Sequence, residues 1–224
     1  MAAPVERFEV EVDYIPQSQT IRIEIPYGDI PTLIRRGYHK AEVTLLDDRK
    51  LSDKQRKACY ALMGEIADFM GEEKSEVKEF MKFEFMTSEL CETGNRLFSM
   101  ANASMSMIAA YQKFLARFII RHNIPTKKPL IGYVDDVADY VYSCLTHKRC
   151  AVCGQHADLH HVDAIGMGND REEVVHEGML ALPLCREHHT ICHTMGNKEF
   201  MRLMHLEPVK LDKTLCRIYG LKRG

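Results

Sequence analysis

The feature of this sequence that most constrains its fold is a concentration of cysteine and histidine toward the C-terminus. Two short segments, "CAVCGQHADLHH" (150–161) and "LCREHHTICH" (184–193), each contain two cysteines and three histidines. Buried structure rarely requires adjacent histidines. These segments therefore predict metal binding, catalysis or both.

Four of these residues have the spacing of two zinc knuckles. Cys150 and Cys153 form a C-x-x-C pair, and Cys185 and His188 form a C-x-x-H pair further along the chain. Zinc prefers four thiolate or imidazole ligands in a tetrahedron, and two paired knuckles supply them. We therefore expect these four residues to bind a structural zinc ion, with His156 as an alternative ligand.

One zinc ion leaves four further histidines unexplained: His160, His161, His189 and His193. Taken singly, each would more often be a hydrogen-bonded structural histidine. Taken together they suggest a site, because "ADLHHVDA" has the character of a strand and "CREHHTICH" suits a helix. On that helix His189 and His193, four residues apart, point the same way. A strand that presents adjacent histidines to such a helix is the arrangement of a ββα-metal nuclease.

The combined pattern C-x-x-C, LHHVD and LPLCREHHTICH resembles the HNH endonuclease family over residues 147–200. The resemblance implies that His160 is a metal ligand and that His161 is the general base. It also implies that His189 and His193 are the other ligands of a catalytic divalent ion such as Mg²⁺, Mn²⁺, Ni²⁺ or Zn²⁺.

Phosphodiester hydrolysis gives these implied roles a chemical basis. A neutral histidine, with a pKa of about 6.5, can take a proton from water near neutral pH. A divalent ion can stabilise both the transition state and the departing 3′ oxygen. One family feature is missing, because the usual central asparagine would fall in "GMLALPLC" near Leu180. Either His176 replaces that asparagine or its role is vacant.

The charge distribution suggests a polyanionic partner. The formal net charge is only -2, but "RKLSDKQRK" (49–57) and "KFLARFIIRHNIPTKK" (113–128) are strongly basic, and such segments can bind nucleic acid. We find no signal peptide and no apolar run long enough to span a membrane. We therefore expect a soluble protein in the reducing cytoplasm of a bacterial host cell, where cysteines are ligands or buried thiols.

Alternating apolar and polar residues predict a β-hairpin near the N-terminus, with strands in "RFEVEVDYI" (7–15) and "TIRIEIP" (20–26) and a turn across "PQSQ". "AEVTLL" (41–46) predicts a third strand. Ser52 is the expected N-cap of the helix "DKQRKACYALMGEIADFM", and Gly71 is its expected end. "KSEVKEFMKFEFM" predicts another helix.

A long helix is expected at residues 102–121. Four of its residues recur at helical spacing and should face a core: Tyr111, Leu115, Phe118 and Ile119. Lys113, Arg117 and Arg121 follow one another at i+4 spacing, in line and without acidic partners. This basic stripe is either an ordinary solvated face or a DNA-binding surface.

The sequence after this helix indicates a domain boundary, followed by further helices. "HNIPTKKPLIGY" (122–133) contains two prolines and no helical pattern, so it marks a boundary between domains. "YVDDVADYVYSCL" predicts a helix that leads into the cysteine and histidine region. "NKEFMRLMHL" and "LDKTLCRIYGL" predict two short helices that pack on it.

The N-terminal half carries a second resemblance. Over residues 45–125 the chain is similar to the Orf (NinB-like) recombination mediators of bacteriophages, through an S-x-x-Q-R-K helix start and a serine- and methionine-rich entry to the long helix. Such proteins bind single-stranded DNA and help to load recombinases, commonly as dimers. The cations that would bind phosphates are Arg49, Lys50, Lys54, Arg56, Lys57, Lys113, Arg117 and Arg121. The plainer interpretation of this half is a scaffold or dimerisation domain.

We therefore predict an α+β fold: a single-stranded DNA-binding domain at 1–125, a linker and connecting helix at 126–146, and a zinc-stapled nuclease domain at 147–224. The predicted function is a phage or prophage recombination protein that binds DNA, single-stranded or branched, and cleaves it. Expected partners are a second copy in a homodimer and a phage recombinase or single-strand-binding protein, with no membrane. A non-catalytic DNA-binding mediator and a zinc-dependent interaction protein stay open as alternatives.

Overall fold

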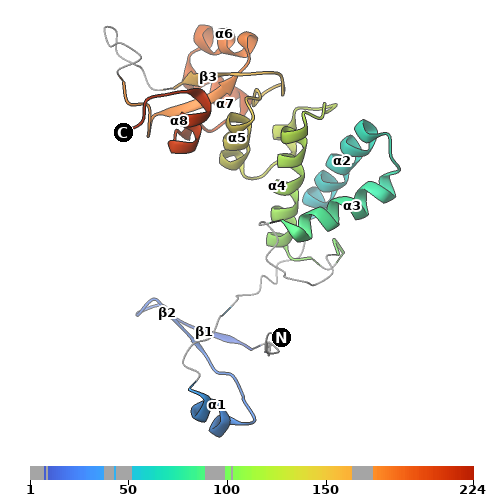
Figure 1. The fold of residues 1–224 in the computed structure, drawn as a ribbon, viewed down its shortest axis with the longest axis vertical. Helices are drawn as coiled ribbons and strands as arrows, with labels where there is room; N and C mark the ends of the chain where they lie inside the picture. Colours follow the sequence, from blue (N-terminus) through green and yellow to red (C-terminus); the bar gives the residue numbers. More distant parts are fainter. Residues whose placement is uncertain are drawn as a thin grey trace. The chain divides into compact units, whose positions relative to one another are not determined.

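The computed structural model describes residues 8, 10–37, 43, 52–88, 99–101, 103–162 and 174–224. The chain divides into two compact units, residues 1–46 and 47–224, and each is described by itself (Figure 1). Helices and two small sheets together make a mixed α+β fold, as the sequence predicts.

The first unit is built around a β-hairpin. Strands β1 (Val12–Ile15) and β2 (Thr20–Ile23) pair in antiparallel orientation. The predicted turn across "PQSQ" is confirmed, because the Ser18 amide donates to the Ile15 carbonyl at 3.2 Å and closes it.

A short helix, α1 (Ile30–Arg36), follows the hairpin. It begins at Asp29, whose carboxylate accepts the Thr32 amide at 3.1 Å. The helix has no buried residue, so it contributes no core to this unit. The predicted third strand at 41–46 lies outside the described residues, apart from Val43.

The second unit begins with two helices that the sequence predicts, α2 (Asp53–Met70) and α3 (Lys74–Thr87), which pack against each other. Both predicted ends of α2 are confirmed. Ser52 Oγ accepts the amide of Gln55 at 3.2 Å, which caps the helix. Gly71 ends it with a φ of 72°, a conformation that favours glycine.

The long helix α4 (Met105–His122) begins later than predicted, because Ser104 caps it by accepting the Met107 amide at 3.2 Å. Its core face is confirmed: Tyr111, Leu115 and Ile119 are buried, and Phe118 is half-buried against them. The spacing of its apolar residues therefore identified the face that packs on α2.

The expectation that the basic stripe of α4 lacks acidic partners is wrong for two of its three residues. Lys113 Nζ lies 2.9 Å from Asp139 Oδ1 and 3.4 Å from Asp136 Oδ2. Arg117 also forms an ion pair with Asp139. Both carboxylates lie at the N-terminal end of helix α5 (Val137–Thr146), where the helix dipole favours acids. Arg121, at the far end of the stripe, is exposed.

The C-terminal region is a small antiparallel sheet covered by short helices. Its elements after α4 are η1 (Leu130–Tyr133), α5, β3 (Asp158–His161), β4 (Leu180–Leu184), α6 (Arg186–Met195), α7 (Asn197–Met204), β5 (Val209–Lys210) and α8 (Lys213–Tyr219). The strand order is β3-β4-β5, and each pair is antiparallel. The helices predicted for the tail are confirmed as α7 and α8.

Helix α5 joins the two groups of helices in Figure 1, because it packs against α4 on one side and against β4 and α8 on the other. The main hydrophobic core of the described residues runs from α2 to α8 and includes Leu62, Tyr111, Leu145, Leu182, Phe200 and Leu215. The functional division of the chain at residues 125–147 stays a prediction. None of the described helices is long and apolar enough to cross a membrane.

Candidate functional site

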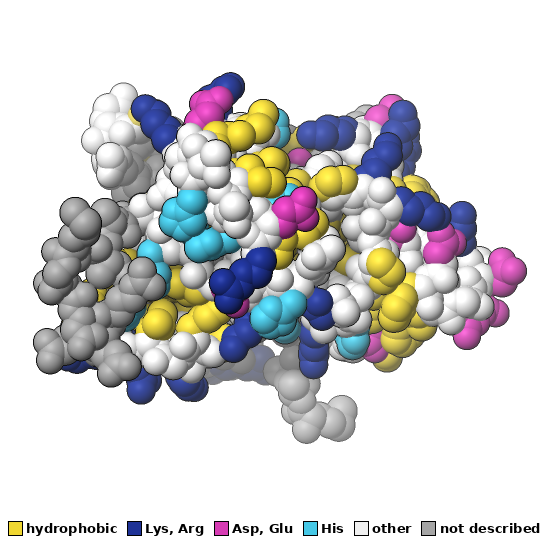
Figure 2. All heavy atoms as spheres, turned by 90° about the horizontal axis from the view of Figure 1, so that it is seen from above, with side chains coloured by type: hydrophobic (Ala, Val, Ile, Leu, Met, Phe, Trp, Pro, Cys, Tyr) yellow, Lys and Arg dark blue, Asp and Glu magenta, His cyan; other side chains and the backbone are white. Residues whose placement is uncertain are grey.

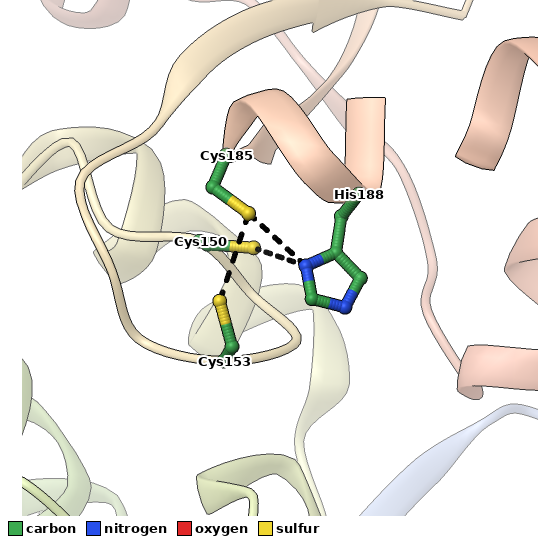
Figure 3. Close-up of side chains that lie close together, drawn as sticks. All are labelled: Cys150, Cys153, Cys185 and His188. Atoms are coloured by element: carbon green, nitrogen blue, oxygen red, sulfur yellow. Dashed lines mark hydrogen bonds between the residues drawn. The ribbon is translucent and has the colours of Figure 1, made fainter. Parts of the chain in front are cut away.

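The two knuckles meet at the N-terminal end of α6. Cys150 and Cys153 lie in a tight turn between α5 and β3, closed by a hydrogen bond from the Gly154 amide to the Cys150 carbonyl at 2.8 Å. Gly154 has a φ of 73°, which suits a residue without a Cβ. Cys185 is the N-cap residue of α6 and His188 lies in its first turn, so both side chains face the C-x-x-C turn (Figure 3).

Two of the distances between these four side chains match those of a tetrahedral metal site, and the distance between Cys185 and His188 is shorter. The Sγ atoms of Cys153 and Cys185 are 3.7 Å apart. His188 Nδ1 lies 3.7 Å from Cys150 Sγ and 3.1 Å from Cys185 Sγ. A tetrahedral ion with Zn–S bonds of about 2.3 Å would place two sulfurs roughly 3.8 Å apart, and a sulfur and a nitrogen roughly 3.6 Å apart. His156, the alternative ligand, is exposed and lies outside this cluster of described residues.

The chemistry of the donors also suits a cation. Desolvation of the sulfur, together with the nearby Cys150 and Cys185, raises the pKa of the Cys153 thiol to about 12. A divalent ion between the sulfurs stabilises thiolates that would otherwise stay protonated. Three sulfurs and one nitrogen fill a tetrahedron and leave no open position, which is typical of a structural zinc site.

A second cluster consists of three histidines between β3 and α6. His189 and His193 are four residues apart on α6, so their side chains point to the same side of the helix. His160 reaches them from β3, with its ring centroid 4.7 Å from that of His189 and 5.0 Å from that of His193. One ring nitrogen of each histidine lies within 4.8 Å of the others, so the three can share one ion.

The surroundings of this cluster favour neutral imidazoles. Burial lowers the pKa of His160, the hydrogen bond with Asn197 partly opposes this, and the neighbouring His193 lowers the pKa further. Burial also lowers the pKa of His189, and both His160 and His193 add to the effect. Only a neutral imidazole offers a lone pair to a metal. Three such ligands suit a transition metal or zinc and leave positions for water and substrate.

Asn197, the first residue of α7, fixes the orientation of the His160 ring. Its Nδ2 donates to the Val162 carbonyl at 2.9 Å, so its Oδ1 is the atom 2.9 Å from His160 Nε2. Because an amide oxygen only accepts, His160 Nε2 carries the proton and Nδ1 keeps the lone pair for a metal. No local sequence pattern connects Asn197 to His160, so the sequence alone does not indicate this residue.

The adjacent histidine, His161, contacts a different group. Successive side chains of a strand alternate between its faces, so His160 and His161 point apart. His161 Nε2 lies 2.9 Å from Nδ1 of His176, a residue only 3% exposed. His176 was the candidate replacement for the missing asparagine, and it lies against the predicted base. The catalytic roles of this pair stay predictions.

The predicted DNA-binding residues are placed only in part. Arg49 and Lys50 lie outside the described residues. The three cations in the first turns of α2 are exposed: Lys54, Arg56 and Lys57. Of these, Lys54 Nζ lies 3.8 Å from Asp135 Oδ1, and Arg56 pairs with an acid of its own helix. Their roles in DNA binding stay predictions, as do those of the stripe on α4.

The histidine cluster is open to solvent on one side. His193 is exposed, and His188 and His189 are partly exposed. Figure 2, which views the molecule from the end that carries α6, shows histidine side chains at the surface with Lys and Arg side chains beside them. A polyanionic substrate could therefore reach the cluster over a surface with basic groups.

A family model described as "Putative HNHc nuclease" (HNHc_6) matches residues 23–222 of the chain. The match includes helices α2 to α4 as well as both metal-ligand clusters, so one family pattern covers both predicted halves. No curated protein and no solved structure matches the chain.

Proposed function

This chain belongs to the HNHc_6 family of nucleases, and we propose that it is a metal-dependent endonuclease that hydrolyses DNA phosphodiester bonds. The observation that carries the proposal is the separation of two histidine sets at strand β3. His160 lies with His189 and His193, which suits metal binding, whereas His161 lies against His176. Hydrolysis needs both a metal site and a proton acceptor that is not itself a ligand.

The Cys₃His cluster is proposed to hold zinc as a structural ion. Its four donors have tetrahedral spacing, and it connects the turn before β3 to the first turn of α6. Because it joins these two segments, a bound ion would stabilise the positions of both histidine sets.

The three-histidine cluster is proposed to hold the catalytic ion. A divalent ion bound there would stabilise negative charge on the phosphate and on the departing 3′ oxygen. The chain itself contributes His161, which takes a proton from the attacking water. His176 holds the His161 ring through their 2.9 Å contact, and Asn197 holds His160 in the tautomer that can bind a metal.

The test is a cleavage assay on single-stranded, duplex and branched DNA with Mg²⁺, Mn²⁺, Ni²⁺ or Zn²⁺ added. The wild-type protein should cut only when a divalent ion is present. His161→Ala should lose roughly 10²- to 10⁴-fold in rate, the typical contribution of a general base, and keep its affinity for DNA and metal. His147→Ala, at an exposed histidine outside both clusters, is the control and should cut normally. Full activity of His161→Ala would contradict the assignment.

A second candidate function is single-stranded DNA binding by the start of α2. Three exposed cations within about one helical turn support it, together with the resemblance of residues 45–125 to phage recombination mediators. Replacing Lys54, Arg56 and Lys57 by alanine should weaken binding to single strands and flatten its salt dependence, because fewer counterions are released. An unchanged salt slope would move the DNA site elsewhere on the protein.

The finer biological assignment rests on that resemblance alone. We propose on that basis that the protein acts in phage recombination, that it forms a homodimer, and that its partner is a recombinase or a single-strand-binding protein. A non-catalytic mediator is the alternative to the nuclease, and the cleavage assay distinguishes them, since such a mediator would bind DNA without cutting it.

A further inference from the structure

Two surface grooves lie on either side of the junction between α4 and α5. The first, of about 530 Å³, is lined by Lys113 and Arg117 but also by four acids, Asp135, Asp136, Asp139 and Glu207. The second, of about 740 Å³, lies between the C-terminal end of α4, the connector 124–130 and the C-x-x-C turn at 149–156. We call the second one the knuckle groove.

The knuckle groove differs from the first groove in charge. Its lining includes Lys127, Lys128, Arg149 and His156, and none of the described residues that line it is Asp or Glu. The ammonium group of Lys127 is paired with Asp68, outside the lining. Lys128 and Arg149 therefore provide its positive charge. In the first groove, by contrast, the two cations are paired with carboxylates of the same groove.

The surroundings of the groove add to its positive potential. Arg121 and His122, at the end of α4, are exposed. Burial lowers the pKa of His147, and the nearby charges of Arg121 and Arg149 lower it further. Arg121 and Arg149 are thus close enough to His147 to disfavour its protonated form. Such a concentration of positive charge would attract an anion.

The lining of the knuckle groove suits a nucleic-acid backbone rather than bases. Its tyrosine, Tyr140, is 4% exposed and donates its hydroxyl to the Ala151 carbonyl at 2.9 Å. Among the described lining residues the exposed ring is the imidazole of His156, and none of these residues is Phe or Trp. Neutral polar groups such as Asn123, Thr126 and Gln155 line the rest. Cations with neutral hydrogen-bonding groups recognise phosphates without regard to sequence.

The groove also adjoins the proposed nuclease site. Cys150 and Cys153 belong both to its lining and to the Cys₃His cluster. The fourth member of that cluster, His188, directly precedes His189 of the three-histidine cluster. A strand bound in the groove thus runs along the turn that is joined to α6, the helix with the catalytic ligands.

We propose that the knuckle groove binds the phosphodiester backbone of the DNA strand that is cleaved, with Lys128 and Arg149 as its phosphate contacts. The proposal rests on the nuclease function proposed above and adds to it a site for the part of the strand outside the catalytic centre. Binding there is electrostatic and independent of sequence, so it should depend strongly on salt.

The test compares two double variants of equal charge loss, Lys128→Ala with Arg149→Ala and Lys213→Ala with Arg217→Ala. The second pair is exposed on α8, outside both grooves. DNA binding is measured in a His161→Ala background by fluorescence anisotropy across a salt series. The groove variant should bind at least tenfold more weakly, with a salt slope lower by roughly 0.7 to 0.9 per lost contact, whereas the α8 variant should bind normally.

Three further measurements separate this proposal from the nuclease proposal. Hydrolysis of bis(4-nitrophenyl) phosphate, a substrate too small to reach the groove, should be unchanged in the groove variant with His161 intact. The zinc content of the groove variant should also equal that of the wild-type protein. Arg149→Lys in place of Arg149→Ala keeps the positive charge at this position and should restore most of the DNA binding.

Distinct results would overturn each proposal. An unchanged salt slope in the groove variant, or an equal change in the α8 variant, would exclude the groove as the backbone site. Loss of hydrolysis of the small substrate in the groove variant would also exclude it, because the pair would then act on the catalytic centre. If the wild-type protein cleaves neither substrate but the groove variant still loses DNA binding, the nuclease proposal fails. The assignment of the knuckle groove as a site for the DNA backbone then still holds.

Discussion

The Cys₃His cluster and the three-histidine cluster share helix α6 but differ in their donors and in their openness. The first has three thiols and one imidazole at tetrahedral spacing, with Cys150 and Cys185 buried. The second has three imidazoles, of which His160 is 2% exposed and His193 is exposed. A tetrahedral ion is saturated by the first set, whereas the second set leaves it room for water or substrate. The number of ligands thus distinguishes a structural site from a reactive one.

The largest expected effect comes from breaking the closed cluster. Cys150→Ser or Cys185→Ser should lose the structural zinc and unfold the region from β3 to α8, because zinc binding to such sites is worth roughly 10 kcal/mol or more. Metal analysis and circular dichroism would show both losses. Cys216→Ala, at a buried cysteine outside the cluster, should keep its zinc. Unchanged zinc content in Cys150→Ser would refute the ligand assignment.

The next effect distinguishes the two adjacent histidines. His160→Ala removes one of three ligands, so the catalytic metal should bind much more weakly and high metal concentration should partly restore cleavage. His161→Ala removes only a proton acceptor, so added metal should not restore it. Cleavage rates titrated with Mn²⁺ or Mg²⁺ would measure this. Rescue of His161→Ala but not of His160→Ala would mean that the two roles are exchanged.

A smaller effect is expected at the residue that orients His160. Asn197→Ala removes the acceptor that fixes the His160 tautomer, and the loss of such an outer partner typically costs 10- to 100-fold in metal affinity or activity. Isothermal titration of the catalytic metal would detect this change, with zinc in the Cys₃His cluster unaffected. Lys198→Ala, at the exposed neighbouring position, is the matched control. Equal affinities in both variants would remove Asn197 from the site.

The smallest effect is a difference in pH dependence between the clusters. The pKa values of His160 and His189 are lowered, so these ligands are already neutral above the ordinary value of about 6.5. Protonation of these two ligands should therefore weaken metal binding only well below that pH. The pKa of Cys153 is raised, so zinc must displace its proton at neutral pH. Zinc affinity should therefore weaken about tenfold or more per unit of pH lost.

Competition titrations between pH 6.5 and 8 measure both slopes in one protein. The Cys₃His cluster should show the steeper slope, and proton release counted in two buffers should be at least one per zinc. Equal slopes for the two clusters would contradict the different protonation states that their surroundings impose.

The parts of both clusters that are local in the chain could be predicted from the sequence. A C-x-x-C turn and the i+4 spacing of His189 and His193 fix side-chain direction through backbone geometry alone. The same is true of the N-terminal hairpin and of the caps of α2. The distribution of polar residues over a few neighbouring positions therefore accounts for most of the ligand set.

Contacts between distant segments could not be predicted in this way. Asn197 is 37 residues from His160, and His176 reaches His161 across 15 residues. Arg117 pairs with Asp139, 22 residues later, beyond a connector that no local pattern orients. These contacts depend on how β3, α5 and α7 pack, which is a property of the whole core rather than of a sequence window.

Helix α6 carries proposed ligands of both clusters at consecutive positions, and bound ions would restrict its freedom to move as a rigid body. Successive residues of an α-helix are offset by about 100° around its axis, so His188 and His189 point to different sides. With an ion in each cluster, α6 is tethered to the C-x-x-C turn in one direction and to β3 in another. A single tether would permit rolling about the helix axis, but two tethers at different angles remove both rolling and sliding. A helix of 10 residues, of which Cys192 alone is buried, is thereby held in one register.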